Sequence, residues 1–223
     1  MSTVATKPQT QSSKMIQVMG GLGALCALLI VLTYEGTAER IAHLKDEALQ
    51  QAVVYVLPGS TSTIEFYIDA DHHISTEWTE NAVPVFAGYD DAGQLIGVAI
   101  EASGRGYADI IKVLYGYDPV KEQIIGFYVL ESKETPGLGD KIQKDASFLK
   151  NFTELDVSLG SNGSTINGVV TVKHGQKKNP WEIDGITGAT ISSRAVGVML
   201  NASPNEWLAV IQKNLSVIQN QGK

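Results

Sequence analysis

The longest apolar run in the chain covers residues 16–34, which include no charged side chain and one strongly polar residue, Gln17. A helix that crosses a bilayer needs about 20 apolar residues, so the run predicts a transmembrane anchor over residues 15–34. Lys14 precedes it and Glu35 follows it. By the positive-inside rule we expect the N-terminus in the cytoplasm and the rest of the chain outside. A cleaved signal peptide is the alternative, but no small-x-small cleavage site is cleanly placed after the run.

On either side of this run the pattern changes. Residues 1–14 are polar and rich in Ser, Thr and Gln, which favours a disordered cytoplasmic tail. Residues 35–80 form a third segment. Its first part carries an apolar stripe at helical spacing (Ile41, Leu44, Ala48), which predicts a stalk helix that ends before Pro58. Its second part, residues 60–80, is β-like and weakly patterned.

Alternation of apolar and polar positions begins at Pro84 and predicts strands separated by turn residues. These strands are expected at residues 85–89, 95–102, 110–117 and 124–131. Short turns join them, so they form an antiparallel meander with one apolar face. We assign residues 81–223 to one domain of the α+β class, an antiparallel sheet flanked by helices.

The C-terminal third contains a short strand at residues 169–173 and then two expected helices. Ile191, Ala195 and Met199 recur at helical spacing, and Thr190 stands where the N-cap of that helix belongs. Pro204 suits the first turn of a second, amphipathic helix over residues 204–219.

Composition narrows the function classes. The formal net charge is −7, which argues against nucleic acid or an anionic lipid surface as the main partner. Cys26 is the only cysteine and lies in the apolar run, so one chain cannot form an internal disulfide or an iron–sulfur cluster. Residues 71–73 (Asp-His-His) lack a spaced third ligand and are interpreted as a solvated hairpin tip. Redox chemistry would therefore need an organic cofactor or a partner's metal.

Two glycine-rich stretches can bring backbone N–H groups close to a ligand. In residues 132–139, Pro136-Gly137 suits a type II turn, Gly139 offers another positive φ, and Asp140 can cap a short helix over residues 141–151. In residues 184–190 (DGITGAT), the glycines lead to a helix N-terminus, where a phosphate is stabilised. A plain connector and a plain N-cap remain the alternatives. The basic residues 173–179 are either a solvated loop or a docking surface.

Together three motifs carry a family resemblance: residues 104–107 (GRGY), 134–139 (ETPGLG) and 184–190 (DGITGAT). In this order they resemble the covalent-FMN-binding domain. That domain occurs in the G subunit of the Rnf electron-transport complex and in the C subunit of the sodium-translocating NADH:quinone reductase. The ETPGLG run and the short spacing are most similar to the Rnf protein. The resemblance covers roughly residues 80–202, and the single N-terminal anchor agrees with it.

The resemblance implies a cofactor site. In this family a flavin transferase takes FMN from FAD and joins its phosphate to the hydroxyl of the motif's last threonine, which is Thr190 here. The expected transferase-recognition set is Asp184, Gly185, Thr187, Gly188, Ala189 and Thr190. Asp184, the only acid of the motif, would either help present the hydroxyl to that enzyme or bind the enzyme's metal. We expect the cofactor-binding set to be Tyr107, Glu134, Thr135, Leu138, Gly139, Thr187, Gly188, Ala189 and Thr190, with no metal and no catalytic residue.

The resemblance also implies a function: a membrane-anchored electron carrier in an Rnf-type ferredoxin:NAD ion-translocating complex. The main domain would lie outside the cytoplasmic membrane of a bacterium, bound to the other membrane subunits, without stand-alone catalysis. Two alternatives stay open. One is the C subunit of the quinone-reducing relative, and the other is a flavin-free anchored interaction or sensory domain.

Overall fold

Helix α1 runs from Gln11 to Val56 in the computed structural model, which describes residues 11–222. The chain divides into two compact units, Met1–Glu47 and Ala48–Lys223. Among the described residues, one helical stretch, Ser13–Val56, is long and apolar enough to cross a membrane. Its apolar side chains before Tyr34 are exposed, as those of a lipid-facing anchor are. Of the predicted tail, residues 1–10 lie outside the described residues, and the helix already includes the remainder.

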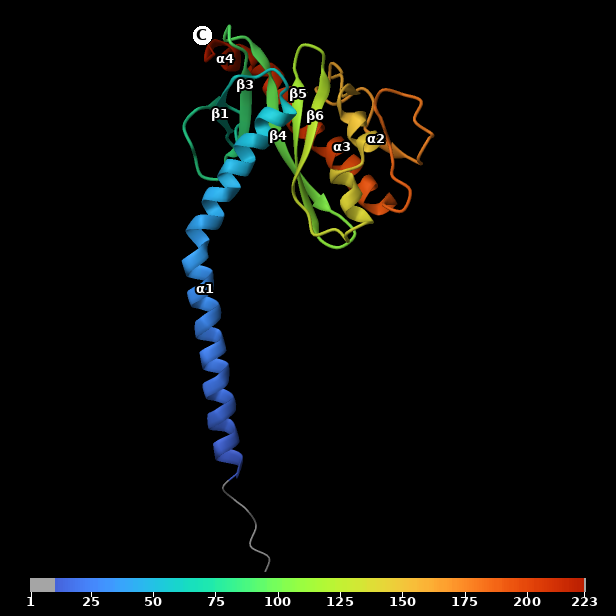
Figure 1. Ribbon diagram of the computed structural model, residues 1–223. Helices are drawn as coiled ribbons and strands as arrows, with labels where there is room; N and C mark the ends of the chain where they lie inside the picture. Colours follow the sequence, from blue (N-terminus) through green and yellow to red (C-terminus); the bar gives the residue numbers. More distant parts are fainter. Residues whose placement is uncertain (1–10, 223) are drawn as a thin grey trace, which may run out of the picture. The chain divides into compact units, whose positions relative to one another are not determined.

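A seven-stranded antiparallel sheet is the centre of the second unit, with the strand order β2-β1-β3-β4-β5-β6-β7. Figure 1 shows β3 to β6 side by side in this sheet. The strands are β1 (Ser62–Ile68), β2 (Ile74–Ser75), β3 (Val83–Tyr89), β4 (Leu95–Arg105), β5 (Ile110–Asp118), β6 (Gln123–Glu131) and β7 (Leu155–Asp156). The α+β prediction and the four-strand meander are confirmed.

Short elements follow the meander and lead to the long C-terminal helix. They are the 3₁₀ helices η1 (Gly139–Gln143) and η2 (Lys150–Phe152), helix α2 (Ala146–Leu149), and the parallel pair β8 (Val170–Val172) and β9 (Glu182–Asp184). Helix α3 (Thr190–Lys213) and helix α4 (Leu215–Asn220) complete the chain.

Both faces of the sheet are covered, so the prediction of one apolar face was wrong. On one face the main core joins the sheet to α3, with Val113, Val196 and Leu200 fully buried. On the other face the end of α1 packs Val53 and Val56 against the sheet, in a smaller cluster with Phe86, Ala99 and Leu114. Gly116 permits this approach, because a Cβ there would meet the Val56 backbone. In a strand that is buried on both faces, apolar residues occupy both sets of alternate positions. A search for alternation between apolar and polar residues therefore does not reveal the second buried face.

Buried tyrosines fasten α3 and α4 to the sheet. The Tyr89 hydroxyl donates to the Ile218 carbonyl (2.6 Å), and the Tyr115 hydroxyl pairs with Ser203 Oγ (2.8 Å). Burial raises the pKa of Tyr89 to about 12, so this phenol keeps its proton and remains a donor. These bonds hold α3 in a fixed register, which in turn fixes its N-terminus at the site described below.

Two helix predictions were wrong. Helix α3 passes through Pro204 without a break, because the apolar face that buries Met199 continues through Leu208 and Ile211. The expected helix over residues 141–151 is instead η1, α2 and η2, and its cap is Asp145, which accepts from Ser147 N (3.0 Å) and Phe148 N (3.1 Å). Asp140 instead accepts from Gly137 N (2.7 Å).

Candidate functional site

A cavity of about 300 Å³ opens at the N-terminus of α3, and we call it the loop cavity. Its walls come from three segments far apart in the sequence: the β4–β5 connection, the loop after β6 and the start of α3. Its lining residues are Tyr107, Glu134, Thr135, Leu138, Gly139, Gly188, Ala189, Thr190, Ile191 and Ser192. Eight of the nine residues expected to bind a cofactor therefore line one cavity, and Ile191 and Ser192, which were not in the expected set, line it as well.

The loop after β6 makes the expected turn. Leu138 N donates to the Thr135 carbonyl (3.1 Å), and Gly137 has φ +79°, as a type II turn requires at its third residue. Asp140 Oδ1 accepts from Gly137 N, while its Oδ2 pairs with Lys144 Nζ at 2.8 Å. The Lys144 ammonium holds the pKa of the Asp140 carboxyl below its usual value. The turn thus points Leu138 at the cavity mouth, where its side chain is exposed.

The buried carboxylate of Glu134 joins the three walls. Its Oε1 accepts from Ala108 N (2.8 Å), its Oε2 accepts from the Ser192 hydroxyl, and only 5 % of the residue is exposed. The prediction of a positive φ at Gly139 was wrong. Gly139 is needed for space instead, because a Cβ there would collide with Glu134 and Ser192 Oγ. Glu134 therefore holds the loops together as well as lining the cavity.

Thr190 is the first residue of α3, so its prediction as the N-cap was wrong by one position. Ala189 occupies the cap and supplies no side-chain cap bond, and Gly188 before it has φ +84°. Thr190 is exposed. The first N–H groups of an α-helix have no partner within the helix, and they carry the positive end of its dipole. Thr190 thus lies at an accessible position that favours an anion.

A second cavity of about 370 Å³ shares Thr190 with the first, and we call it the basic cavity. Its lining residues are Thr171, Val172, Lys173, His174, Gln176, Gly185, Ile186, Thr187, Thr190, Ser193 and Arg194. Thr187, expected among the cofactor-binding residues, lines this cavity rather than the loop cavity. Lys173, His174 and Gln176 come from the basic loop whose role the sequence left open, and they stand beside Thr190 in the folded chain.

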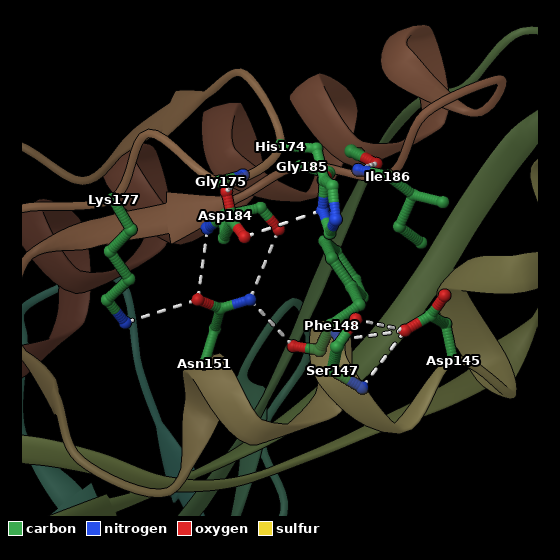
Figure 2. A network of polar contacts seen from close by, with 11 residues as sticks. Asp145, Ser147, Phe148, Asn151, His174, Gly175, Lys177, Asp184, Gly185 and Ile186 are labelled. Carbon is green, nitrogen blue, oxygen red and sulfur yellow. Dashed lines mark hydrogen bonds and ion pairs between the residues drawn. The ribbon is translucent and has the colours of Figure 1, made fainter.

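Asp184 is held by a polar network, shown in Figure 2. Its Oδ1 accepts from Gly175 N (2.7 Å), and its Oδ2 lies 3.5 Å from His174 Nδ1. The Nδ1 of His174 lies 3.1 Å from the Gly185 carbonyl oxygen, which is an acceptor, so that nitrogen carries the proton. The Asp184 carboxylate therefore faces its own chain.

Asn151 is the centre of the same network (Figure 2), and nothing in the sequence singled it out. Its Nδ2 donates to the carbonyls of Phe148 (2.9 Å) and Asp184 (3.2 Å). Its Oδ1 accepts from Asp184 N (3.0 Å) and Lys177 Nζ (3.1 Å). Burial lowers the pKa of the Lys177 ammonium, against the opposing charges of Asp184 and Glu182. The side chain of Asn151 thus fixes the backbone where the 184–190 motif begins.

The predicted turn at residues 71–73 is present. Asp69 Oδ1 accepts from Asp71 N and His73 N, both at 2.9 Å, and all three side chains of the tip are exposed. Across residues 11–222, no three His, Cys, Asp or Glu side chains gather in a way that could hold a metal ion.

Residues 106–203 match the family described as FMN-binding domain, a span that includes both cavities. A relative from Methanosarcina acetivorans, named as the G subunit of an ion-translocating oxidoreductase complex, is 30 % identical over 187 residues, 82 % of this chain and 88 % of that one. A protein of the same name from Shewanella loihica is 30 % identical over 190 residues, 82 % of each chain.

Two solved structures share the fold. The C subunit of a Na(+)-translocating NADH-quinone reductase from Parabacteroides distasonis superposes with a TM-score of 0.60 at 24 % identity, over 79 % of this chain and 96 % of that one. NqrC from Shewanella oneidensis superposes with a TM-score of 0.55 at 21 % identity, over 81 % and 98 %. At these identities the likeness concerns the fold alone.

Proposed function

The chain belongs to the family of G subunits of ion-translocating oxidoreductase complexes, and on that basis we propose that it carries FMN linked through its phosphate to Thr190 and passes electrons within such a complex. The circuit proposed for this complex is the Rnf type, between ferredoxin and NAD. The observation that carries the proposal is the position of Thr190. Its side chain lines both the loop cavity and the basic cavity, at the positive end of α3.

The residues of the loop cavity suit a flat, partly exposed ring. The exposed side chains of Tyr107, Leu138 and Ile191 supply apolar contact area at its mouth. Gly139 leaves its wall slim, and the cavity volume lies at the lower end of the range for small-molecule sites, about 300–1,000 Å³. A ring there would keep one edge accessible. When bound, FMN would supply the reversible acceptance of electrons.

Attachment would require Thr190 as a nucleophile. Its Oγ would bond to the FMN-side phosphorus of FAD, the bond between the two phosphates would break, AMP would leave, and the hydroxyl proton would pass to a base. A threonine hydroxyl needs such a base, which a flavin transferase would bring to the exposed residue. The product anion would lie at the free N–H groups of the first turn of α3, a site that stabilises phosphate.

The membrane arrangement follows from α1. Its apolar first half would anchor the chain beside the other membrane subunits of the complex. The family membership supports such partners. Lys14 before the apolar run and Glu35 after it favour a cytoplasmic N-terminus and a main domain outside the cytoplasmic membrane. Alkaline phosphatase fused after Lys223 should be active in cells, and an inactive, stable fusion would contradict this orientation.

The alternatives are less well supported. The likeness to the C subunit of the quinone reductase is one of fold, whereas the likeness to the G subunits extends through the sequence of most of both chains. The two glycine loops and an accessible threonine line one cavity, an arrangement that suits a bound cofactor and that a flavin-free interaction domain does not require. We therefore keep the electron-carrier function.

The function is tested on the full chain in detergent, produced with and without a flavin transferase. The loaded chain should show flavin absorption that survives denaturation and bleaches reversibly on reduction. A chain that acquires no denaturation-resistant flavin would contradict attachment, and one whose flavin cannot be reduced and reoxidised would contradict electron carriage.

Glu134→Gln is expected to raise the reduction potential of the loaded chain. The buried carboxylate accepts hydrogen bonds from Ala108 N and Ser192 Oγ and lines the loop cavity, so its negative charge opposes the addition of electrons there. A tenfold change in the reduction equilibrium corresponds to about 59 mV for one electron, and we expect at least that. Potentiometric titration measures it, with the exposed Glu206→Gln on α3 as the control. An unchanged or lower potential would contradict the placement of the flavin ring beside Glu134 in the loop cavity.

A further inference from the structure

The Asp184 side chain is engaged by its own fold. Its carboxylate accepts from Gly175 N at 2.7 Å, it is 3.5 Å from His174 Nδ1, and the side chain is only 23 % exposed. A hydrogen bond from a backbone N–H to a charged carboxylate is among the stronger ones in proteins. Oδ1 is therefore already used within the chain, and direct recognition of this carboxylate by a transferase would be limited to the remaining acceptor sites of a largely covered group.

The bond holds a loop that forms one wall of the basic cavity. Lys173, His174 and Gln176 line the cavity from residues 173–176, and Asp184 does not contribute to the lining. Gly175 has φ +76° and is the third residue of a turn closed by the bond from Gln176 N to the Lys173 carbonyl (2.9 Å), and the Asp184 carboxylate binds the N–H of this same glycine. The carboxylate is therefore placed to fix the loop, and through it the position of the Lys173 and His174 side chains.

The backbone that carries the Asp184 carboxylate is itself held in place by hydrogen bonds. Asn151 pairs with both backbone groups of Asp184, and Gly185 N donates to the Val172 carbonyl (3.0 Å). A Cβ on Gly185 would lie 2.8 Å from that same oxygen, so the two strands approach as closely as they can. The position of the Asp184 carboxylate is thus set by the core, and the loop takes its position from the carboxylate.

The wall matters because it stands beside the acceptor hydroxyl. Thr190 shares the basic cavity with Lys173 on the loop and Arg194 on α3, two basic residues that line the same cavity as the residue that would receive a phosphate group. Cations near a transferring phosphoryl group stabilise the charge that develops on its oxygens. A displaced loop would remove one of them and reshape the surface that a second active site must fit.

We propose that Asp184 is a positioning residue for attachment at Thr190: its carboxylate fixes residues 173–176 as a wall of the basic cavity, and the flavin transferase contacts that wall rather than the carboxylate. The inference rests on the proposed function. The role of Asp184 is then to accept the hydrogen bond from Gly175 N. A neutral oxygen acceptor can replace the carboxylate in that role.

The test compares Asp184→Asn with Asp184→Ala in the full detergent-solubilised chain, incubated with purified transferase and FAD. Flavin fluorescence in denaturing gels gives the initial rate and its dependence on chain concentration. Asp184→Asn keeps an acceptor oxygen and should label within about threefold of the wild-type rate. Asp184→Ala loses the hydrogen bond to Gly175 N, and its kcat/KM should fall at least about tenfold, because the free energy of one ordinary hydrogen bond corresponds to a factor of about ten. Asp91→Asn in the exposed β3–β4 turn is the matched control, expected at the wild-type rate.

Hydrogen–deuterium exchange of a peptide covering residues 173–179 gives a second readout. Protection should persist in wild type and Asp184→Asn and be reduced in Asp184→Ala, where Gly175 N loses its acceptor while Lys178 N and Asn179 N keep theirs on Glu182. Labelling of Asp184→Asn as poor as that of Ala would overturn the proposal, as would an Ala variant that labels normally. If Ala does not fold, the rate of Asn alone decides. A wild-type chain that never labels would instead refute the proposed function.

Discussion

Thr190→Ala is expected to abolish denaturation-resistant flavin fluorescence in chain produced with the transferase. Thr190 is the exposed hydroxyl residue that lines both cavities, at the N-terminus of α3. Alanine is a good helix former, so α3 and the fold should persist. The measurement is the ratio of flavin fluorescence to protein stain in a denaturing gel.

Thr190→Ser supplies the matched control, because it keeps the hydroxyl and should retain labelling. Neighbouring hydroxyls test specificity: Ser192 and Ser193 are buried, and neither should take the flavin when Thr190 is removed. Residual labelling of the Ala variant would place the bond elsewhere and contradict the assignment.

Asn151→Ala is expected to lower the free energy of unfolding by about 2–6 kcal/mol, because the two backbone groups of Asp184 lose partners and each unsatisfied buried group costs about 1–3 kcal/mol. Small domains are stable by only about 5–15 kcal/mol, so this is a large fraction. Urea unfolding of the full chain in detergent, followed by tryptophan fluorescence, measures it, since Trp181 precedes β9 directly.

The control for this variant is Asn162→Ala. Asn162 lies in an exposed loop and accepts a single bond, from Ser164 N at 3.1 Å. Its removal should change stability by no more than about 0.5 kcal/mol. Equal midpoints for the two variants would show that the Asn151 network carries no stability and would weaken the account of how the 184–190 motif is held.

Local features of the site were predictable because they depend on local chemistry. A Pro-Gly pair specifies the turn at residues 135–138, and the observed φ of Gly137 agrees. Apolar periodicity located α3 and placed Thr190 at its start within one residue, the usual uncertainty of a helix boundary. The meander was predictable for the same reason, since its turns are short.

Features that depend on tertiary contacts were not predictable. Gly139 is required because Glu134 and Ser192 meet beside it, and these residues are far apart in the sequence. Asn151 gave no signal, because an asparagine in a short connector looks the same whether or not it supports a distant strand. Proline usually marks a helix start, but at Pro204 the burial of Leu208 and Ile211 outweighs one lost backbone bond.

The central claim is a phosphoester between FMN and Thr190, and intact mass spectrometry followed by peptide mapping tests it most directly. Chain produced with the transferase should gain the mass of one FMN less one water, and the gain should map to the peptide that contains residues 184–194. The Thr190→Ala chain should gain nothing. An unmodified wild-type chain, or the same gain on a peptide that lacks Thr190, would contradict the account.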